Sequence, residues 1–223
     1  IQNLSSLELE HKNLFVDVGC GDGSFLVKIA PQFTKSVGVL PSKDECFWVR
    51  KTLGSRENIR IELGTAEDLS TSNIINCADF ILCNGVLHGV GFTLELVERS
   101  IRNFSNYQKP GQLLYIGEMP LNNELANRNY GLSFRKYMFW CIKNKFYTRL
   151  FINIFRYIKA LSTDYVYVIQ ETNMFFCDPN HFESIGNRNG YELLAAYNSS
   201  TNERLEFNDL PSTGRVDYIF RRT

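Results

Sequence analysis

One glycine-rich segment has residue types and a spacing that suit ligand binding. It reads Asp17-Val18-Gly19-Cys20-Gly21-Asp22-Gly23-Ser24 and follows an apolar run, Leu14 to Val18, that predicts a buried strand. Glycines let the backbone pass close to a ligand, and the helix expected after them offers free N–H groups. The glycines are spaced GxGxG. The fingerprint of a dinucleotide-binding site is GxGxxG, and this chain has Ser24 where the third glycine of that fingerprint would be. The segment therefore predicts a binding loop that differs from a dinucleotide site.

Three further segments follow in an order that, together with this loop, resembles a known family. They are Ile61 to Leu69, Ala78 to His88, and the two β-rich runs Tyr191 to Tyr197 and Val216 to Arg221. With the loop DVGCGDG they resemble class I S-adenosylmethionine-dependent methyltransferases of the small-molecule type. The resemblance covers roughly residues 13 to 118 and 173 to 222.

The resemblance implies a role for each matching position, with S-adenosylmethionine as cofactor and S-adenosylhomocysteine as product. Asp17 would hold the loop or the amino group of the cofactor, and Asn84 would lie near its sulfonium. The alternative for Asp17 is a carboxylate that only tightens the loop. The methionine part would be lined by Gly19, Cys20, Gly21 and Gly23, and the adenine would be contacted by Thr65, Ala66 and Glu67.

The end of the second strand departs from the family pattern. An Asp or Glu is usual there and accepts the two ribose hydroxyls, but this chain has Leu40. Loss of such an acceptor costs on the order of 1.5–3 kcal/mol unless a neighbour such as Asp44 or the backbone replaces it. A non-catalytic binding protein that kept the fold is therefore the alternative to an enzyme.

Two residues are candidate catalytic groups. His88 follows the fourth predicted strand, at the edge where a parallel sheet binds ligands, and its ordinary pKa of about 6.5 suits a general base. Its alternative role is a hydrogen bond to the loop backbone. Glu118, at the end of the fifth predicted strand, is expected at the same edge, to orient the acceptor or to act as the base. Its alternative role is a negative charge at the start of a following helix.

A basic, aromatic segment interrupts the pattern after the fifth strand, from about residue 120 to 172. We interpret it as a helical lid, in which Tyr130 and Tyr137 are candidate substrate-contacting residues. Such a stretch suits an anionic acceptor or contact with a membrane surface. The alternative is a lid whose aromatic residues pack on the domain or on a second subunit. From Asn127 to Ser162 it contains no acid, and its basic residues are Arg128, Arg135, Lys136, Lys143, Lys145, Arg149, Arg156 and Lys159.

Strands alternate with helical patterns through the first half, which is typical of a parallel sheet. The strands are expected at 14–18, 36–40, 59–63, 80–83, 112–117, 191–197 and 216–221. Ser42 and Glu45 form a capping box, Thr93 caps another helix, and Pro179 begins the last. The prediction is one α/β domain, 1–223, with a doubly wound, mostly parallel seven-stranded Rossmann-like sheet and a helical lid insertion at about 120–172.

Composition narrows the expected setting of the protein. Lys plus Arg equals Asp plus Glu at 24 each, so no nucleic-acid partner is expected. The six cysteines form no CxxC pair, which favours reduced thiols in the cytoplasm and no metal site, and no apolar run reaches the ~20 residues of a membrane span.

We predict O-methylation of a small polar acceptor, such as a sugar or a nucleotide-linked or phosphorylated sugar, in bacterial glycan or metabolite biosynthesis. Nitrogen or carbon acceptors and a homodimer remain compatible with the sequence.

Overall fold

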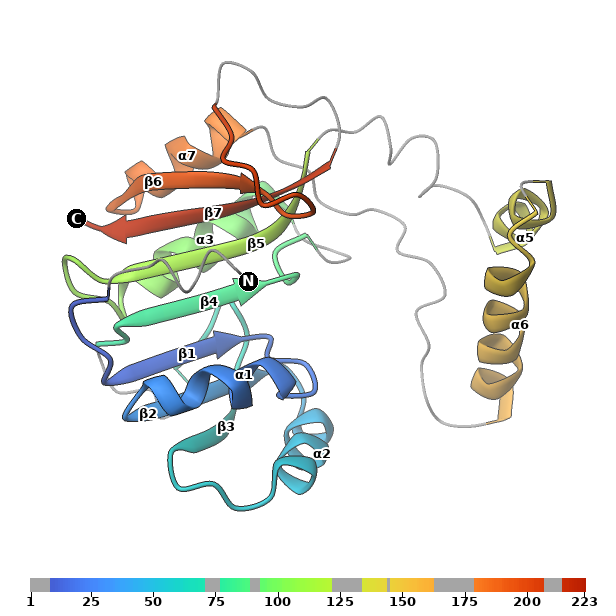
Figure 1. The fold of residues 1–223 in the computed structure, drawn as a ribbon, viewed down its shortest axis with the longest axis horizontal. Coiled ribbons are helices and arrows are strands. Elements are labelled where there is room, and N and C mark those ends of the chain that lie inside the picture. The colour runs from blue at the N-terminus through green and yellow to red at the C-terminus, as the bar shows by residue number, and fades with distance from the viewer. Residues whose placement is uncertain are drawn as a thin grey trace.

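A seven-stranded mixed sheet forms the centre of the computed structural model, which describes residues 9–70, 77–88, 93–121, 134–143, 145–162, 179–206 and 214–223 (Figure 1). The strand order is β3-β2-β1-β4-β5-β7-β6, in which β1 to β5 are parallel and β7 is antiparallel to both its neighbours. This is the predicted Rossmann-like sheet, and the fold prediction is confirmed. The strands are β1 (Leu14–Val18), β2 (Lys35–Leu40), β3 (Ile59–Leu63), β4 (Phe80–Asn84), β5 (Leu113–Leu121), β6 (Tyr191–Asn198) and β7 (Gly214–Arg222).

Helices cover both faces of the sheet. Figure 1 shows α1 in front of the sheet and α3 and α7 behind it. Buried apolar side chains accordingly form two clusters, one containing Phe15, Leu26 and Phe80 and the other containing Ile81, Ile101 and Phe182. The helices of this part are α1 (Ser24–Ile29), followed by the short 3₁₀ helix η2 (Ala30–Gln32), and α2 (Lys43–Leu53), α3 (Leu94–Ser105) and α7 (Pro179–Arg188).

Local sequence signals fix where α2 and α3 begin. The side chain of Ser42 accepts a hydrogen bond from the backbone N–H of Glu45 at 3.1 Å and donates to the Glu45 carboxylate at 3.0 Å. The side chain of Thr93 accepts a hydrogen bond from the N–H of Leu96 at 3.3 Å. Both predicted caps are confirmed, and each satisfies an N–H that the first helical turn leaves without a partner.

The fifth strand is longer than its sequence pattern indicates. We predicted 112–117, whereas β5 extends to Leu121 because β7 pairs with it antiparallel as far as Gly214. The register shifts between Ile116 and Met119, which marks a bulge at this point. Glu118 therefore lies inside a strand, and the predictions that it ends the strand or begins a helix are wrong.

Two helices, α5 (Phe134–Lys143) and α6 (Tyr147–Ser162), lie within the segment predicted as a lid. They contact each other, and Figure 1 shows them apart from the sheet. Helical structure in this segment is confirmed, and its action as a lid stays a prediction. In the described part of the chain, these and all other helices are too short or too polar to cross a bilayer.

Candidate functional site

The glycine loop after β1 folds into a conformation that suits glycine. Gly19, Gly21 and Gly23 have φ angles of 76°, 56° and 76°, in the left-handed region that other residues rarely adopt. The N–H of Gly19 donates to the carbonyl of Val39 at 2.9 Å, and the N–H of Gly23 donates to that of Cys20 at 3.0 Å. The loop therefore connects β1 to α1 tightly while leaving its backbone uncovered at Gly21, where an added Cβ would meet nothing within 4 Å.

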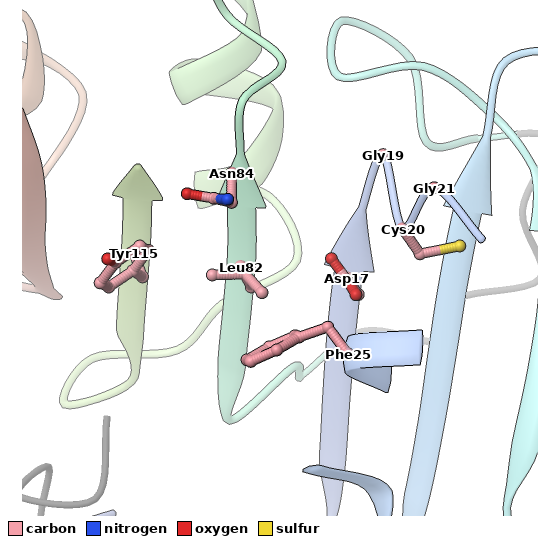
Figure 2. Close-up of a pocket in the computed structure, with 8 residues that line it drawn as sticks. All are labelled: Asp17, Gly19, Cys20, Gly21, Phe25, Leu82, Asn84 and Tyr115. Carbon is pink, nitrogen blue, oxygen red and sulfur yellow. The ribbon is translucent and has the colours of Figure 1, made fainter. Parts of the chain in front are cut away.

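A pocket opens next to this loop, at the carboxyl ends of β1 and β4 (Figure 2). Strand register places Asp17 beside Leu82, and Leu82 beside Tyr115, in one row across the sheet. Figure 2 shows the ring of Phe25 extending from the start of α1 toward β4. The pocket is lined by Asp17, Gly19, Cys20, Gly21, Phe25, Leu82, Asn84 and Tyr115.

Asp17 gives this pocket its charge. Its side chain is buried, and burial raises its pKa from 3.8 to about 7, because a carboxylate loses its hydration there. The same burial, together with the charge of Asp17, raises the pKa of the Cys20 thiol to about 12, so that Cys20 stays protonated. Asp17 is the one ionisable carboxyl among the lining residues, which contain no Lys or Arg. The pocket therefore favours a ligand group with positive charge over a phosphate.

A glycine makes room for the amide at the end of β4. Gly117 on β5 pairs with Asn84, and a Cβ at Gly117 would overlap the side-chain amide of Asn84. The next residue along the chain, Gly85, has a φ of 70° and donates its N–H to the carbonyl of Gly117 at 3.1 Å. Asn84 is thereby held at the carboxyl edge of the sheet, with its side chain in the pocket wall.

The two candidate catalytic residues lie together beside Gly85. His88 Cε1 and Glu118 Oε2 are each 3.9 Å from the position that a Cβ on Gly85 would take. His88 is buried, whereas the side chain of Glu118 is 41% exposed and pairs with the guanidinium of Arg215. Both residues therefore lie near Gly85 at the carboxyl edge of the sheet, and their catalytic roles stay predictions.

A network of residues on β5, on β7 and in the turn after β6 holds Glu118 in place. Glu118 has a φ of 61°, which is unusual for a residue other than glycine. Its N–H donates to the buried carboxylate of Asp217 at 2.8 Å. The hydroxyls of Tyr115 and Ser199 donate to the same carboxylate at 2.6 and 2.5 Å. Asp217 therefore fixes both the backbone beside the pocket and Tyr115 in its wall.

Five residues with a predicted cofactor role lie outside the cavity itself. Gly23 caps α1 and packs on Leu53, and the buried side chain of Leu40 belongs to the apolar core. Thr65 is exposed in a turn closed by hydrogen bonds with Asp68. Ala66 is buried, and its carbonyl accepts a hydrogen bond from Asn103 at 2.9 Å. Glu67 is half-buried. The contacts predicted for these positions stay predictions.

The two lid tyrosines cannot be placed at the site. Tyr130 and the side chain of Tyr137 lie outside the described residues, and the backbone of Tyr137 belongs to α5.

Sequence reasoning missed several residues of the site. Phe25, Leu82 and Tyr115 line the pocket, and Asp217 and Arg215 support its rim. Side chains alternate between the two faces of a strand, so the sequence pattern of the fourth and fifth strands could have indicated that Leu82 and Tyr115 share a face with the pocket. Asp217 and Arg215 gave no such signal, because their roles depend on how β7 pairs with β5.

Comparisons with known proteins agree with this fold. Residues 16–116 match the family model described as "Methyltransferase domain". No curated protein matches the chain. The fold is similar to that of a SAM-dependent methyltransferase from Methanosarcina mazei, at 14% identity and a TM-score of 0.62, covering 99% of this chain and 96% of that one.

Two larger proteins share the fold as well. The mitomycin 7-O-methyltransferase MmcR is 15% identical, with a TM-score of 0.60, and the match covers 100% of this chain and 52% of MmcR. LepI in complex with SAM is 14% identical, with a TM-score of 0.57, and the match covers 100% of this chain and 46% of LepI. The chain therefore spans about half the length of these two proteins.

Proposed function

This chain carries a class I S-adenosylmethionine-dependent methyltransferase domain, and from that premise we propose that it methylates an oxygen atom of a small polar acceptor. The observation that carries this proposal is the position of His88 and Glu118 beside Gly85, one residue along from Asn84 in the pocket wall. A hydroxyl acceptor needs a base, and this pair supplies two candidates at one place.

The residues of the pocket fit the cofactor. S-adenosylmethionine carries positive charge on its sulfonium and its amino group, and the pocket offers the carboxyl of Asp17 and the amide of Asn84 without any basic side chain. Gly21 leaves the loop backbone uncovered, as close approach of a ligand requires, and Gly19 lines the same pocket. The same features argue against a nicotinamide dinucleotide, because its pyrophosphate would meet a carboxylate and no cation.

Each residue of the site then has a proposed task. Asp17 holds the amino group of the cofactor, Gly19, Cys20 and Gly21 form the wall along its methionine part, and Asn84 lies near its sulfonium. When bound, S-adenosylmethionine supplies an electrophilic methyl group. His88 accepts the proton of the acceptor hydroxyl, and Glu118, held by Asp217 and Arg215, orients the acceptor. Much of the rate enhancement in methyl transfer comes from in-line positioning of the reacting groups. The contacts that hold Glu118 would therefore contribute to catalysis together with the base.

The proposed acceptor is a sugar or a nucleotide-linked or phosphorylated sugar, in bacterial glycan or metabolite biosynthesis in the cytoplasm. The acid-free, basic segment from Asn127 to Ser162 supports an anionic acceptor, with Tyr130 and Tyr137 as proposed substrate contacts. The same segment is the proposed lid of a single domain. The bacterial setting rests on the richness of the chain in Asn, Lys, Ile and Phe, an association that suits an AT-rich genome.

Leu40 favours a second candidate, a non-catalytic binding protein of the same fold. Its side chain is buried in the core, so it offers no side-chain acceptor for the ribose hydroxyls at the end of β2. Ser42 and Glu45 at the start of α2 are bonded to each other, whereas the carboxylate of Asp44 is exposed in the same helical turn. We propose that Asp44 takes over the ribose contact, with Thr65, Ala66 and Glu67 beside the adenine.

Calorimetric titration with S-adenosylmethionine and S-adenosylhomocysteine tests the two candidates. An enzyme is expected to bind at micromolar concentration, or about −8 kcal/mol. Asp44→Asn should then weaken binding by roughly tenfold or more, while Glu57→Gln, an exposed acid that precedes β3, should not. If neither ligand binds the wild-type chain, the non-catalytic protein becomes the better description.

Single-turnover rates test the roles of His88 and Glu118 once sugar nucleotides and related hydroxyl acceptors have been screened with labelled cofactor. Loss of a general base costs about 10²–10⁴-fold in rate. We expect that loss from His88→Ala, and a smaller loss from Glu118→Gln. His181→Ala, which removes an exposed histidine at the start of α7, is the matched control and should leave the rate unchanged. A slow Glu118→Gln and a fast His88→Ala would reverse the assignment.

A further inference from the structure

The pair of helices α5 and α6 carries an exposed apolar surface that we call the helix-pair face. Its side chains are between 42% and 69% exposed, which is high for large apolar residues. On α6, Phe151, Phe155 and Ile158 are spaced so that they share one side of the helix. The face consists of Phe139, Ile142, Phe146, Tyr147, Phe151, Ile152, Phe155 and Ile158.

The two helices contact each other, and some of their apolar side chains are less exposed than this face. Cys141 of α5 is fully buried, and Leu150 and Ile154 of α6 are half-buried. The chain turns tightly between the helices, where the N–H of Phe146 donates to the carbonyl of Cys141 at 2.9 Å. The pair is therefore already packed on its inner side, and the helix-pair face is additional apolar surface that faces water. An apolar patch of this extent marks an interaction site.

Charge identifies the kind of surface that this face would meet. No acid occurs from Asn127 to Ser162, and eight basic residues do. Two of them, Lys143 and Lys145, are exposed at the turn between the helices. Exposed aromatic and aliphatic side chains beside basic ones are the composition of helices that lie on an anionic membrane surface.

We propose that the helix-pair face binds the surface of an anionic lipid bilayer. At 16 residues, α6 is about 24 Å long, less than the ~30 Å of a hydrocarbon core, so the pair would lie on the membrane rather than cross it. A second copy of the chain would bring the same excess of basic charge to the contact and be repelled. The described sheet already has helices on both faces, so it does not need this pair to complete its core. This proposal does not rest on the proposed methyl transfer, although both concern the same basic segment.

Vesicle sedimentation of the full chain tests the proposal. We expect it to sediment with vesicles of phosphatidylcholine and phosphatidylglycerol at low salt, to be released at high salt, and to stay in solution with pure phosphatidylcholine. Hydrogen exchange of the wild-type chain gives a second readout that needs no variant. The amides of α5 and α6 should exchange more slowly when anionic vesicles are added, while those of α3 are unchanged.

Two pairs of variants separate the apolar from the charged contribution. Phe151→Ser with Phe155→Ser should weaken binding by roughly tenfold or more, whereas Phe47→Ser with Trp48→Ser, also more than half exposed but on α2, should not. Lys143→Glu with Lys145→Glu should also weaken it by roughly tenfold, and Lys12→Glu with Lys109→Glu is the matched control. All these side chains are exposed, so unchanged circular dichroism is expected and is the check on folding.

Three results would overturn the proposal. The first is no sedimentation with anionic vesicles at low salt. The second is a dimer, seen by light scattering without lipid, that the Phe151→Ser and Phe155→Ser variant abolishes, because the face would then bind a second copy. The third is slow exchange in α5 and α6 when S-adenosylhomocysteine is added without lipid, and no further slowing with vesicles, because the face would then cover the domain itself.

Discussion

The pocket beside the glycine loop and the corner that supports it depend on different kinds of contact. The corner consists of Asp217 and its three hydrogen-bond donors, Tyr115, Glu118 and Ser199. The pocket takes Asp17 from the end of β1 and Gly19 and Gly21 from the turn that follows, so a short stretch of chain determines most of its shape. The corner joins Tyr115 to Asp217, which are 102 residues apart, through the antiparallel pairing of β5 with β7. The first depends on local backbone conformation, and the second depends on tertiary contacts.

This difference predicts where each region is sensitive to substitution. A side chain added to a glycine with left-handed φ strains the backbone, and we expect that strain to stay within the loop. Removal of a buried carboxylate that accepts three hydrogen bonds leaves all three donors without an acceptor, which lowers the stability of the fold. Changes in the loop should therefore act on ligand binding, and changes in the corner on the stability of the fold.

Removing the carboxylate of Asp217 should have the largest effect on the protein. Asp217→Ala leaves the Tyr115 hydroxyl, the Ser199 hydroxyl and the Glu118 N–H without their acceptor, so we expect the free energy of unfolding to fall by about 3 kcal/mol. Urea denaturation measures the change. Asp217→Asn keeps one oxygen acceptor and should recover part of the loss, whereas Glu57→Ala, at an exposed turn, should cost little. A loss below ~1 kcal/mol in Asp217→Ala would contradict this account of the corner.

The same contrast explains what could be predicted from the sequence. The strands, the two helix caps and the glycine loop depend on residues within a few positions of one another, and local patterns found them. The meeting of His88 with Glu118 was also predictable, because the ends of parallel strands lie at one edge of a sheet. The last part of β5 was not, since its pairing partner is almost 100 residues away and the bulge at Glu118 has no local signal.

A side chain at Gly19 should have the next largest effect, on cofactor binding. Gly19→Ala puts a Cβ onto the side chain of Val86 at a φ of 76°, where the strain alone costs about 1–2 kcal/mol. We expect the affinity for S-adenosylhomocysteine to fall by roughly 100-fold, or about 2.7 kcal/mol, in calorimetry. Gly54→Ala is the matched control, because its φ is 65° and an added Cβ meets nothing within 4 Å. Equal losses in both variants would mean that general strain, not the pocket, weakens binding.

Asp17 should make cofactor binding depend on pH. With its pKa raised to about 7 by burial, Asp17 is mostly protonated at pH 6 and mostly ionised at pH 8. If the carboxylate holds the cofactor amino group, affinity should rise about tenfold over this interval, because the fraction of ionised Asp17 rises by that factor. Asp17→Asn removes this contribution and keeps any titration of the ligand itself. Parallel pH profiles for the wild-type chain and Asp17→Asn would leave Asp17 with the role of tightening the loop.

The ion pair of Arg215 with Glu118 should have the smallest effect. Both side chains are partly exposed, at 39% and 41%, so water screens the pair. We expect Arg215→Gln to lower the free energy of unfolding by less than ~1 kcal/mol, about as much as Arg188→Gln, which breaks a comparable exposed pair with Glu98. Urea denaturation of the two variants measures both values. A loss above ~2 kcal/mol for Arg215→Gln alone would mean that the left-handed backbone at Glu118 is held by its side-chain partner, and the corner would then depend on charge at its surface more than on the buried Asp217.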